Sequence, residues 1–349
     1  MKIKKEKHFW TYLIVVFIII LSCFIISKSL TTTTHGKADT LFGVITKISE
    51  YFNPSSLKEK SVYEIRKVLH NQTTRWSSSN IIQSVNVKNT DIQTAFNQIP
   101  VRIYSPSNGS SLPLIIYSHG GSWLSGSIDD YDNICKKLSK YTNAIVISVN
   151  YRLAPEDPFP AGLNDVYNVL QWAYNNAESI SGDPTRICVA GDSAGGNLSA
   201  AVSQMSRDEG GPKITSQVLI YPSTNIYELN TKSWEYFSMT FNLKKEDFKK
   251  FISLYVPTLE DRKSSYASPL LSQNLKGLPN TLIITAELDP LRDEGEAYGE
   301  KLKESGVAVI YSRYRGVSHG FVSMDRITRK ADKALKEISE YLQKQFSKT

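Results

Sequence analysis

Short apolar runs and amphipathic segments alternate along most of this chain, and their order predicts a fold. After residue 76, apolar runs have the length of buried strands, and the segments between the later runs repeat apolar residues at helical spacing. Alternating strands and helices predict a mostly parallel sheet with helices on both faces. The predicted strands are residues 81–87, 99–104, 114–118, 144–149, 187–190, 218–221, 282–285 and 307–311. The predicted helices are residues 129–141, 163–177, 194–207, 294–304 and 323–346.

Two further segments predict a cap over this sheet. No helix separates the first two strands, so we expect them to be antiparallel and to lead into the sheet. Residues 225–262 form a charged, aromatic and helix-like insertion between two buried strands, and residues 41–69 have the apolar spacing of one or two amphipathic helices. We therefore assign residues 41–80 to N-terminal cap helices and residues 81–349 to the main α/β domain, with the cap insertion at about 225–262.

The N-terminal segment predicts a membrane anchor. Residues 9–26 contain no formally charged side chain, and a helix of that length covers most of the hydrocarbon core of a bilayer. Four lysines precede this run and only Lys28 lies just beyond it, which places the N-terminus in the cytoplasm by the positive-inside rule. We assign residues 1–8 to a basic cytoplasmic tail, 9–27 to a single transmembrane helix and 28–40 to a linker, with the globular part outside the cytoplasm. The alternative is a signal peptide whose cleavage releases a secreted protein.

Charge and cysteine content exclude several classes of function. The formal net charge is +7, but three of these units lie in the first eight residues and the remainder forms no basic stripe, so we expect no nucleic-acid partner. Hydrophobic residues make up 41% of the chain, which is enough for a packed core. Three cysteines cannot form a disulfide framework, and no cysteine or histidine spacing indicates zinc. We therefore expect neither a metal nor a cofactor.

A glycine–x–serine–x–glycine pattern at residues 191–195 predicts a nucleophile. Ser193 lies between a predicted strand and a helix of small residues, where a sharp turn lifts the hydroxyl clear of the chain and flanking glycines avoid collisions. The hydroxyl then lies at the positive end of the following helix. The pattern alone is also compatible with an ordinary glycine-rich turn. Its place between a readable strand and a readable helix favours the catalytic interpretation.

A serine nucleophile needs a base, and His319 is the candidate. Of five histidines, only His119 and His319 lie in the strand–helix region, and His319 is in the loop between the last strand and the last helix. Asp289 follows the seventh predicted strand and could orient the imidazole across the carboxyl edge of the sheet. On spacing alone, Glu287 or Asp293 could take this role. We expect Glu287 to support the loop and Asp293 to be the N-cap of the next helix.

Consecutive glycines after the third predicted strand indicate a site for developing negative charge. Gly120, Gly121 and Ser122 follow that strand, and glycine lets the backbone bend so that N–H groups point to one place. Together with the N–H of Ala194, this turn forms a predicted oxyanion hole. We assign no proton transfer to His119, whose ring is expected to bind loop carbonyl groups.

These stretches, taken in order, resemble the hormone-sensitive-lipase-like branch of the α/β-hydrolases, which includes bacterial carboxylesterases and arylacetamide deacetylase. The matching stretches are His119-Gly120-Gly121, Tyr151-Arg152-Leu153-Ala154-Pro155-Glu156, Phe159-Pro160-Ala161, residues 191–197, residues 289–293 and Ser318-His319-Gly320-Phe321. The resemblance implies an α/β-hydrolase fold with Ser193 as nucleophile, Asp289 as acid and His319 as base. It also implies that the cap covers an acyl pocket.

The resemblance further implies how the oxyanion hole is built. Gly120 would shape the turn, and the N–H groups of Gly121, Ser122 and Ala194 would be the donors. Ser122 departs from the family, which often has a third glycine at this position. Because a serine retains its backbone N–H, we expect the hole to persist with a more constrained loop.

The expected function is that of a membrane-tethered serine esterase. Its substrate would be a small-molecule ester with a short to medium acyl chain, and its only other expected partner is the lipid bilayer. One alternative keeps the same three residues but acts on amides or on acetylated glycans. Another is a non-catalytic ligand-binding protein on the same fold, which the presence of Ser193, Asp289 and His319 argues against.

Overall fold

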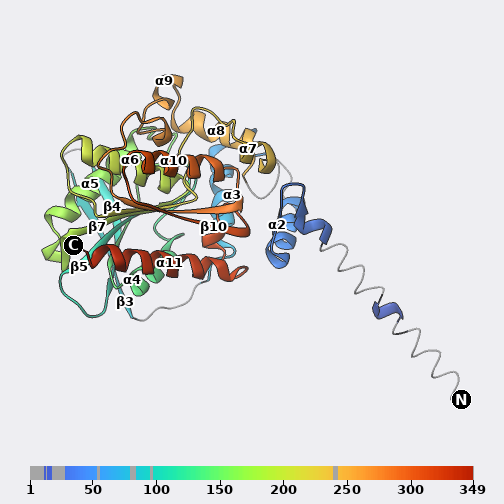
Figure 1. Cartoon of the computed structure of the whole chain (residues 1–349), viewed down its shortest axis with the longest axis horizontal. Helices are drawn as coiled ribbons and strands as arrows, with labels where there is room; N and C mark the ends of the chain where they lie inside the picture. The colour runs from blue at the N-terminus through green and yellow to red at the C-terminus, as the bar shows by residue number, and fades with distance from the viewer. Residues whose placement is uncertain are drawn as a thin grey trace, which may run out of the picture.

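The computed structural model describes residues 12, 14–17, 28–52, 56–78, 84–94, 97–238 and 243–348 (Figure 1). Within these residues an eight-stranded sheet has the order β10-β9-β8-β7-β5-β6-β4-β3. Its strands are β3 (Val85–Gln93), β4 (Gln98–Pro106), β5 (Leu112–Ser118), β6 (Ile145–Val149), β7 (Gly182–Asp192), β8 (Ser216–Ile220), β9 (Asn280–Leu288) and β10 (Val309–Ser318). β4 pairs antiparallel with β3 and β6, and the other neighbouring strands are parallel. The predicted mostly parallel sheet is confirmed.

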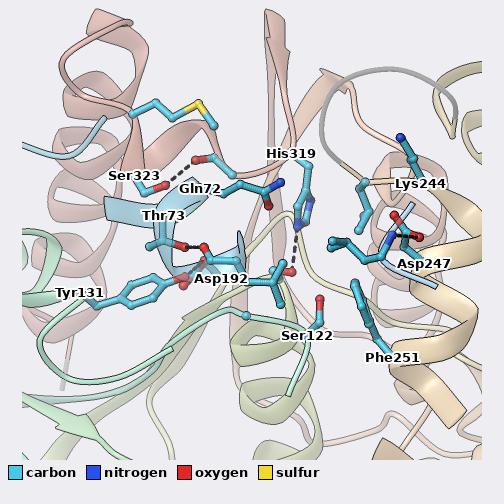
Figure 2. A pocket seen from close by; sticks show the side chains of 17 residues that line it. Gln72, Thr73, Ser122, Tyr131, Asp192, Lys244, Asp247, Phe251, His319 and Ser323 are labelled. Atoms are coloured by element: carbon cyan, nitrogen blue, oxygen red, sulfur yellow. Dashed lines mark hydrogen bonds between the residues drawn. The ribbon is translucent and has the colours of Figure 1, made fainter. Parts of the chain in front are cut away.

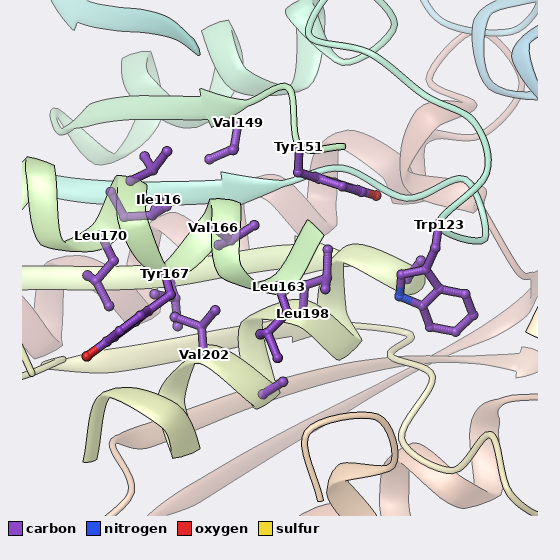
Figure 3. Close-up of a cluster of buried hydrophobic side chains, with 14 of the residues drawn as sticks. Ile116, Trp123, Val149, Tyr151, Leu163, Val166, Tyr167, Leu170, Leu198 and Val202 are labelled. Carbon is purple, nitrogen blue, oxygen red and sulfur yellow. The ribbon is translucent and has the colours of Figure 1, made fainter. Parts of the chain in front are cut away.

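Helices cover both faces of this sheet, which explains why its central strands are apolar on both sides. The main helices are α4 (Asp132–Thr142), α5 (Ala161–Asn175), α6 (Ala194–Asp208), α10 (Arg292–Glu304) and α11 (Arg329–Phe346). Ile115 of β5 belongs to a buried cluster with side chains of α4 and α11. Its neighbour Ile116 belongs to a second cluster with Leu163 of α5 and Leu198 of α6 (Figure 3). Alternate residues of one strand therefore serve two separate cores.

Helices occupy both of the segments that the sequence analysis assigned to a cap. One group precedes the sheet and the other lies in the insertion after β8, on the same side of the sheet as α6 and α10 (Figure 1). The cap helices are α2 (Thr40–Phe52), α3 (Val62–Thr74), α7 (Lys232–Phe237), α8 (Lys245–Tyr255) and α9 (Leu259–Arg262). Asp247 of α8 joins the two groups, because its carboxylate accepts hydrogen bonds from the backbone N–H groups of Leu57 and Lys58 at 2.7 and 3.1 Å.

The segment expected to be a linker is folded against the main domain where the structure describes it. Its threonines form a short hairpin of β1 (Thr32–Thr33) and β2 (Gly36–Lys37). Ala38 packs with Leu288 at the end of β9, and the N–H of Asp39 donates to the carbonyl of Gly316 at 2.8 Å. A polar composition indicated a linker, but these long-range contacts order the segment beside the loops that follow β9 and β10.

The first strand differs from its predicted boundaries. The prediction was residues 81–87, of which 81–83 lie outside the described residues, and β3 extends to Gln93 through a polar stretch. Antiparallel pairing with β4 continues from Val85 to Gln93 and satisfies the backbone of these positions. β3 is an edge strand, and most of its side chains are polar and exposed to solvent. A search for apolar runs therefore did not detect its full length.

The predicted tail at residues 1–8 and most of the predicted anchor at 9–27 lie outside the described residues. Tyr12 and residues 14–17 are helical. Within the part of the chain that the structure describes, no helix combines the length and the apolar character that spanning a bilayer would require. The transmembrane anchor therefore stays a prediction.

Candidate active site

Ser193 occupies the sharp turn between β7 and α6 that the sequence predicted. Its φ of 56° and ψ of −117° are a strained conformation for a residue with a side chain. The turn is held by a hydrogen bond from the N–H of Ser193 to the carbonyl of Ile220, at 2.9 Å. Gly195 permits the close approach of α6 to β5, because a Cβ at this position would lie 1.9 Å from the carbonyl oxygen of Ser118. The surrounding chain thus holds Ser193, a largely buried residue, at the wall of a pocket.

The structure brings together the three predicted residues of the site. The Nε2 atom of His319 lies 2.8 Å from the Oγ atom of Ser193, and its Nδ1 atom lies 2.8 Å from Oδ2 of Asp289. Asp289 is fully buried, whereas the His319 side chain retains 14% of its exposure. An ionised carboxylate can only accept, so the Nδ1–H of His319 donates to Asp289 and the lone pair on Nε2 accepts from the serine hydroxyl. This is the tautomer that a general base requires.

The acidic residues around Asp289 have distinct roles. Oδ1 of Asp289 accepts a hydrogen bond from the N–H of Leu291 at 2.9 Å, which fixes the carboxylate at the end of β9. Glu287 accepts from the N–H of Gly316 at 2.8 Å and so supports the segment that leads to His319, as predicted. Asp293 lies in the first turn of α10 and is not its N-cap, because that helix begins at Arg292, two residues earlier than expected. Its carboxylate accepts from the N–H of Ser233 in the cap at 2.8 Å.

The loop after β5 presents two of the three predicted donors, Gly121 and Ser122, and the first residue of α6, Ala194, presents the third. Gly121 has a φ of +117°, and a Cβ there would lie 2.1 Å from the carbonyl oxygen of Ser125, so glycine is required. Ser122 has a φ of +55° at the position where the family often has glycine. The N–H groups of Gly121, Ser122 and Ala194 have no acceptor among the described residues. They can therefore stabilise an oxyanion, whereas the N–H of Gly120 already donates to Asp192 at 3.0 Å.

Asp192, which precedes the nucleophile, is a residue that the sequence analysis missed. Its buried carboxylate accepts hydrogen bonds from the hydroxyl groups of Tyr117 at 2.9 Å and Tyr131 at 3.2 Å, besides the N–H of Gly120. Burial raises the pKa of this carboxyl to about 6, against the opposing effect of these hydrogen bonds. Asp192 thus connects the nucleophile turn to the oxyanion loop. Asp192 occupies the first x of the glycine–x–serine–x–glycine pattern. Because the pattern accepts any residue there, the sequence did not indicate this role.

His119 has the structural role that was predicted from the sequence. Its ring is fully buried and stacks on Tyr151 and Tyr131, with centroid distances of 4.3 and 5.5 Å. Its Nδ1–H donates to the carbonyl of Gly120 at 2.8 Å. Burial lowers the pKa of His119 to about 4, so the ring is neutral and stabilises the oxyanion loop by packing.

A pocket of about 80 Å³ opens at the nucleophile. Ser193, His319 and Ser122 line its base, and the cap supplies apolar side chains that include Leu69 of α3 and Phe251 of α8 (Figure 2). Cap helices from two distant parts of the sequence therefore enclose one small cavity above the reacting groups.

A serine–histidine–aspartate arrangement at the carboxyl edge of this sheet, with free N–H groups beside the serine, is characteristic of the α/β-hydrolases. The chain belongs to the family described as alpha/beta hydrolase fold, whose model matches residues 115–323.

Similar proteins confirm the predicted resemblance. Carboxylesterase NlhH of Mycobacterium tuberculosis is 41% identical over 240 residues, which cover 68% of this chain and 75% of that protein. Arylacetamide deacetylase of Bos taurus is 36% identical, over 65% of this chain and 73% of its own. The esterase of Pyrobaculum calidifontis has a TM-score of 0.79 at 35% identity, covering 86% of this chain and 97% of that structure. A thermostable esterase from Pseudomonas putida has a TM-score of 0.85 at 29% identity, covering 90% and 99%.

We predict that Asp192→Ala lowers kcat by roughly 10- to 100-fold with a smaller change in KM, because the oxyanion loop loses the acceptor of the Gly120 N–H. Steady-state kinetics with a p-nitrophenyl ester measures both constants. Asp192→Asn is the matched control, since its amide oxygen can still accept that hydrogen bond, and it should retain most of the activity. Wild-type kinetics in Asp192→Ala would contradict this role.

Proposed function

We propose that this protein is a serine carboxylesterase that hydrolyses small esters of short to medium acyl chains through an acyl-enzyme. The observation that carries the proposal is the pair of 2.8 Å contacts through which His319 joins Ser193 to Asp289. The names of its relatives support the same chemistry, because those at 41% and 35% identity include a carboxylesterase and an esterase.

The geometry supports a two-step reaction. Ser193 attacks the ester carbonyl while Nε2 of His319 takes the hydroxyl proton, and the carbonyl oxygen becomes an oxyanion. The N–H groups of Gly121, Ser122 and Ala194 stabilise that charge, and one such donor contributes about 2.7–4 kcal/mol in the transition state. The imidazolium then protonates the leaving alcohol, and a water activated by His319 releases the acid.

The buried carboxylate of Asp289 stabilises the imidazolium between these two steps. A non-catalytic binding protein would not need this arrangement. Three groups from separate loops lie within hydrogen-bonding distance, and the pocket above them gives a carbonyl group access to the serine. These features favour an enzyme over a binding module.

Ser193→Ala should lower kcat/KM for a p-nitrophenyl ester on the order of 10⁴-fold or more, because no other hydroxyl of the described residues that line this pocket is hydrogen-bonded to an imidazole. Ser179→Ala, at an exposed serine away from the pocket, should have wild-type kinetics. If Ser193→Ala keeps a substantial fraction of the activity, the proposed nucleophile is wrong.

A protonated His319 cannot accept the serine proton, so kcat/KM should rise as the pH increases from acid toward neutral. Asp192 has a pKa raised to about 6 and is a second group that could titrate in this range. The rise should therefore persist in Asp192→Asn, which lacks that ionisation. A flat profile, or a rise that disappears in Asp192→Asn, would show that His319 is not the base.

We also propose that residues 9–27 form a single transmembrane anchor, with the N-terminus in the cytoplasm and the catalytic domain outside it. The uncharged run and the lysines that precede it support this topology. Exposed apolar side chains of Leu41, Ile48 and Tyr51 on α2 are also compatible with a nearby bilayer. The alternative, secretion after signal cleavage, predicts a shorter mature chain.

The full-length protein should stay in the membrane pellet after an alkaline carbonate wash, and protease added to intact cells should digest the catalytic domain. A variant without residues 1–27 should be released from the membrane and still hydrolyse a p-nitrophenyl ester. Mass spectrometry of the mature N-terminus separates the two topologies. A chain that begins after residue 27 would contradict the anchor, and a domain protected in intact cells would contradict the orientation.

A further inference from the structure

A second cavity, of about 610 Å³, adjoins the pocket at Ser193. The two cavities share five lining residues, namely Leu57, Gln72, Lys244, Asp247 and Met324. The rest of the larger cavity is lined mainly by α2 and α3, the two helices that precede the sheet. The pocket at the nucleophile, at about 80 Å³, accommodates only a small group. The remainder of a bulky ester must therefore occupy the larger cavity.

Ten of the fourteen residues that line this larger cavity carry polar side chains, and apolar atoms make up about half of its surface. Its hydroxyl, amide and charged side chains are those of Thr46, Ser49, Glu50, Lys60, Asn71, Gln72, Thr74, Arg75, Lys244 and Asp247. Three basic groups face two acidic ones, and both acidic groups have partners. Glu50 pairs with Lys47 at 3.0 Å, and Asp247 accepts from backbone N–H groups of the cap. A nearly balanced charge does not favour a strongly ionic ligand, and a wall that is about half polar does not favour a plain hydrocarbon chain. The lining matches a neutral ligand that carries many hydroxyl groups.

Gln72 lies where the two cavities meet. Its side chain projects from α3 into the pocket beside His319 (Figure 2), and its amide makes no hydrogen bond to another described residue. A carboxamide offers both a donor and an acceptor, so it can bind a hydroxyl group in either direction. Trp76 adds an aromatic wall to the larger cavity, with the guanidinium of Arg75 5.0 Å from its ring centroid. An aromatic ring and amides together suit a saturated ring with apolar faces and hydroxyl edges.

We infer that the larger cavity binds the alcohol portion of the ester and selects a neutral, hydroxyl-rich alcohol such as a sugar ring, with Gln72 as a specificity-determining residue. The small pocket then holds a short acyl group against Ser193. This inference rests on the proposed ester hydrolysis and adds the class of the alcohol.

Two acetate esters of matched shape test the inference. In 6-O-acetylglucose and cyclohexylmethyl acetate, the acyl group is the same and the six-membered rings are similar in size, but only the sugar carries hydroxyl groups. The full-length enzyme should hydrolyse 6-O-acetylglucose with a kcat/KM at least about 10-fold higher than that for cyclohexylmethyl acetate. An apolar ring would leave the polar side chains of the cavity without hydrogen-bond partners. An equal or reversed preference would overturn the inference.

The variant Gln72→Leu tests whether the side-chain amide of Gln72 causes the preference for the sugar ester. This variant should raise KM for 6-O-acetylglucose by roughly 5- to 10-fold, the loss of about one hydrogen bond, and change KM for cyclohexylmethyl acetate by less than about twofold. Asn175→Leu, which replaces an exposed amide on α5, is the matched control and should leave both constants unchanged. Equal losses on both esters in Gln72→Leu would indicate a structural role only and contradict the inference.

Hydrolysis of p-nitrophenyl acetate separates this inference from the proposed function. If wild-type enzyme and Gln72→Leu both cleave p-nitrophenyl acetate, the chain is folded and the esterase proposal holds, so an absent sugar preference counts against the cavity alone. If neither this ester nor the two ring esters is cleaved by the wild-type enzyme, the proposed function fails and the inference fails with it.

Discussion

The imidazole of His319 is the interaction on which the candidate site depends. It forms hydrogen bonds of 2.8 Å with a carboxylate on one side and a hydroxyl on the other, and these partners lie 30 and 126 residues away in the sequence. Hydrogen-bond strength falls steeply with poor geometry, so the ends of β7, β9 and β10 must hold a common position. Several of the surrounding hydrogen bonds hold these strand ends together. Glu287 joins the β9 end to the β10 loop, and the N–H of Ser193 is bound to the end of β8.

A second network fixes the side of the site where charge develops. Asp192 joins the nucleophile turn to Gly120, so that the loop after β5 directs its free N–H groups toward the serine. The buried carboxylate of Glu294 has a comparable effect on the cap, because it accepts from the indole N–H of Trp234 at 3.0 Å and the N–H of Thr224 at 2.9 Å. Burial raises the pKa of Glu294 to about 8, which indicates how strongly the fold desolvates these connections. Packing therefore places the donors before any substrate binds.

Patterns with a local physical cause could be predicted from the sequence. Apolar periodicity identified the strands and helices, and turn chemistry identified Ser193, Gly121 and Asp289, because each follows a strand in parallel order. Contacts between distant segments could not be predicted. The hairpin at residues 32–37 is ordered because the chain that follows it packs against the end of β9, which its own composition does not indicate. Gln72 lines the pocket only because α3 packs over the nucleophile. The role of Asp192 likewise depends on groups that the fold brings to its carboxylate, and a variable position in a motif does not reveal them.

The most direct test of the central claim asks which side chain is an activated nucleophile. A fluorophosphonate probe reacts with a serine whose proton is removed by an adjacent base, and peptide mapping by mass spectrometry then identifies the modified residue. We expect a single adduct on Ser193, which His319→Ala prevents while the protein keeps its circular dichroism spectrum. No adduct, an adduct on another residue, or labelling that persists without His319 would contradict it.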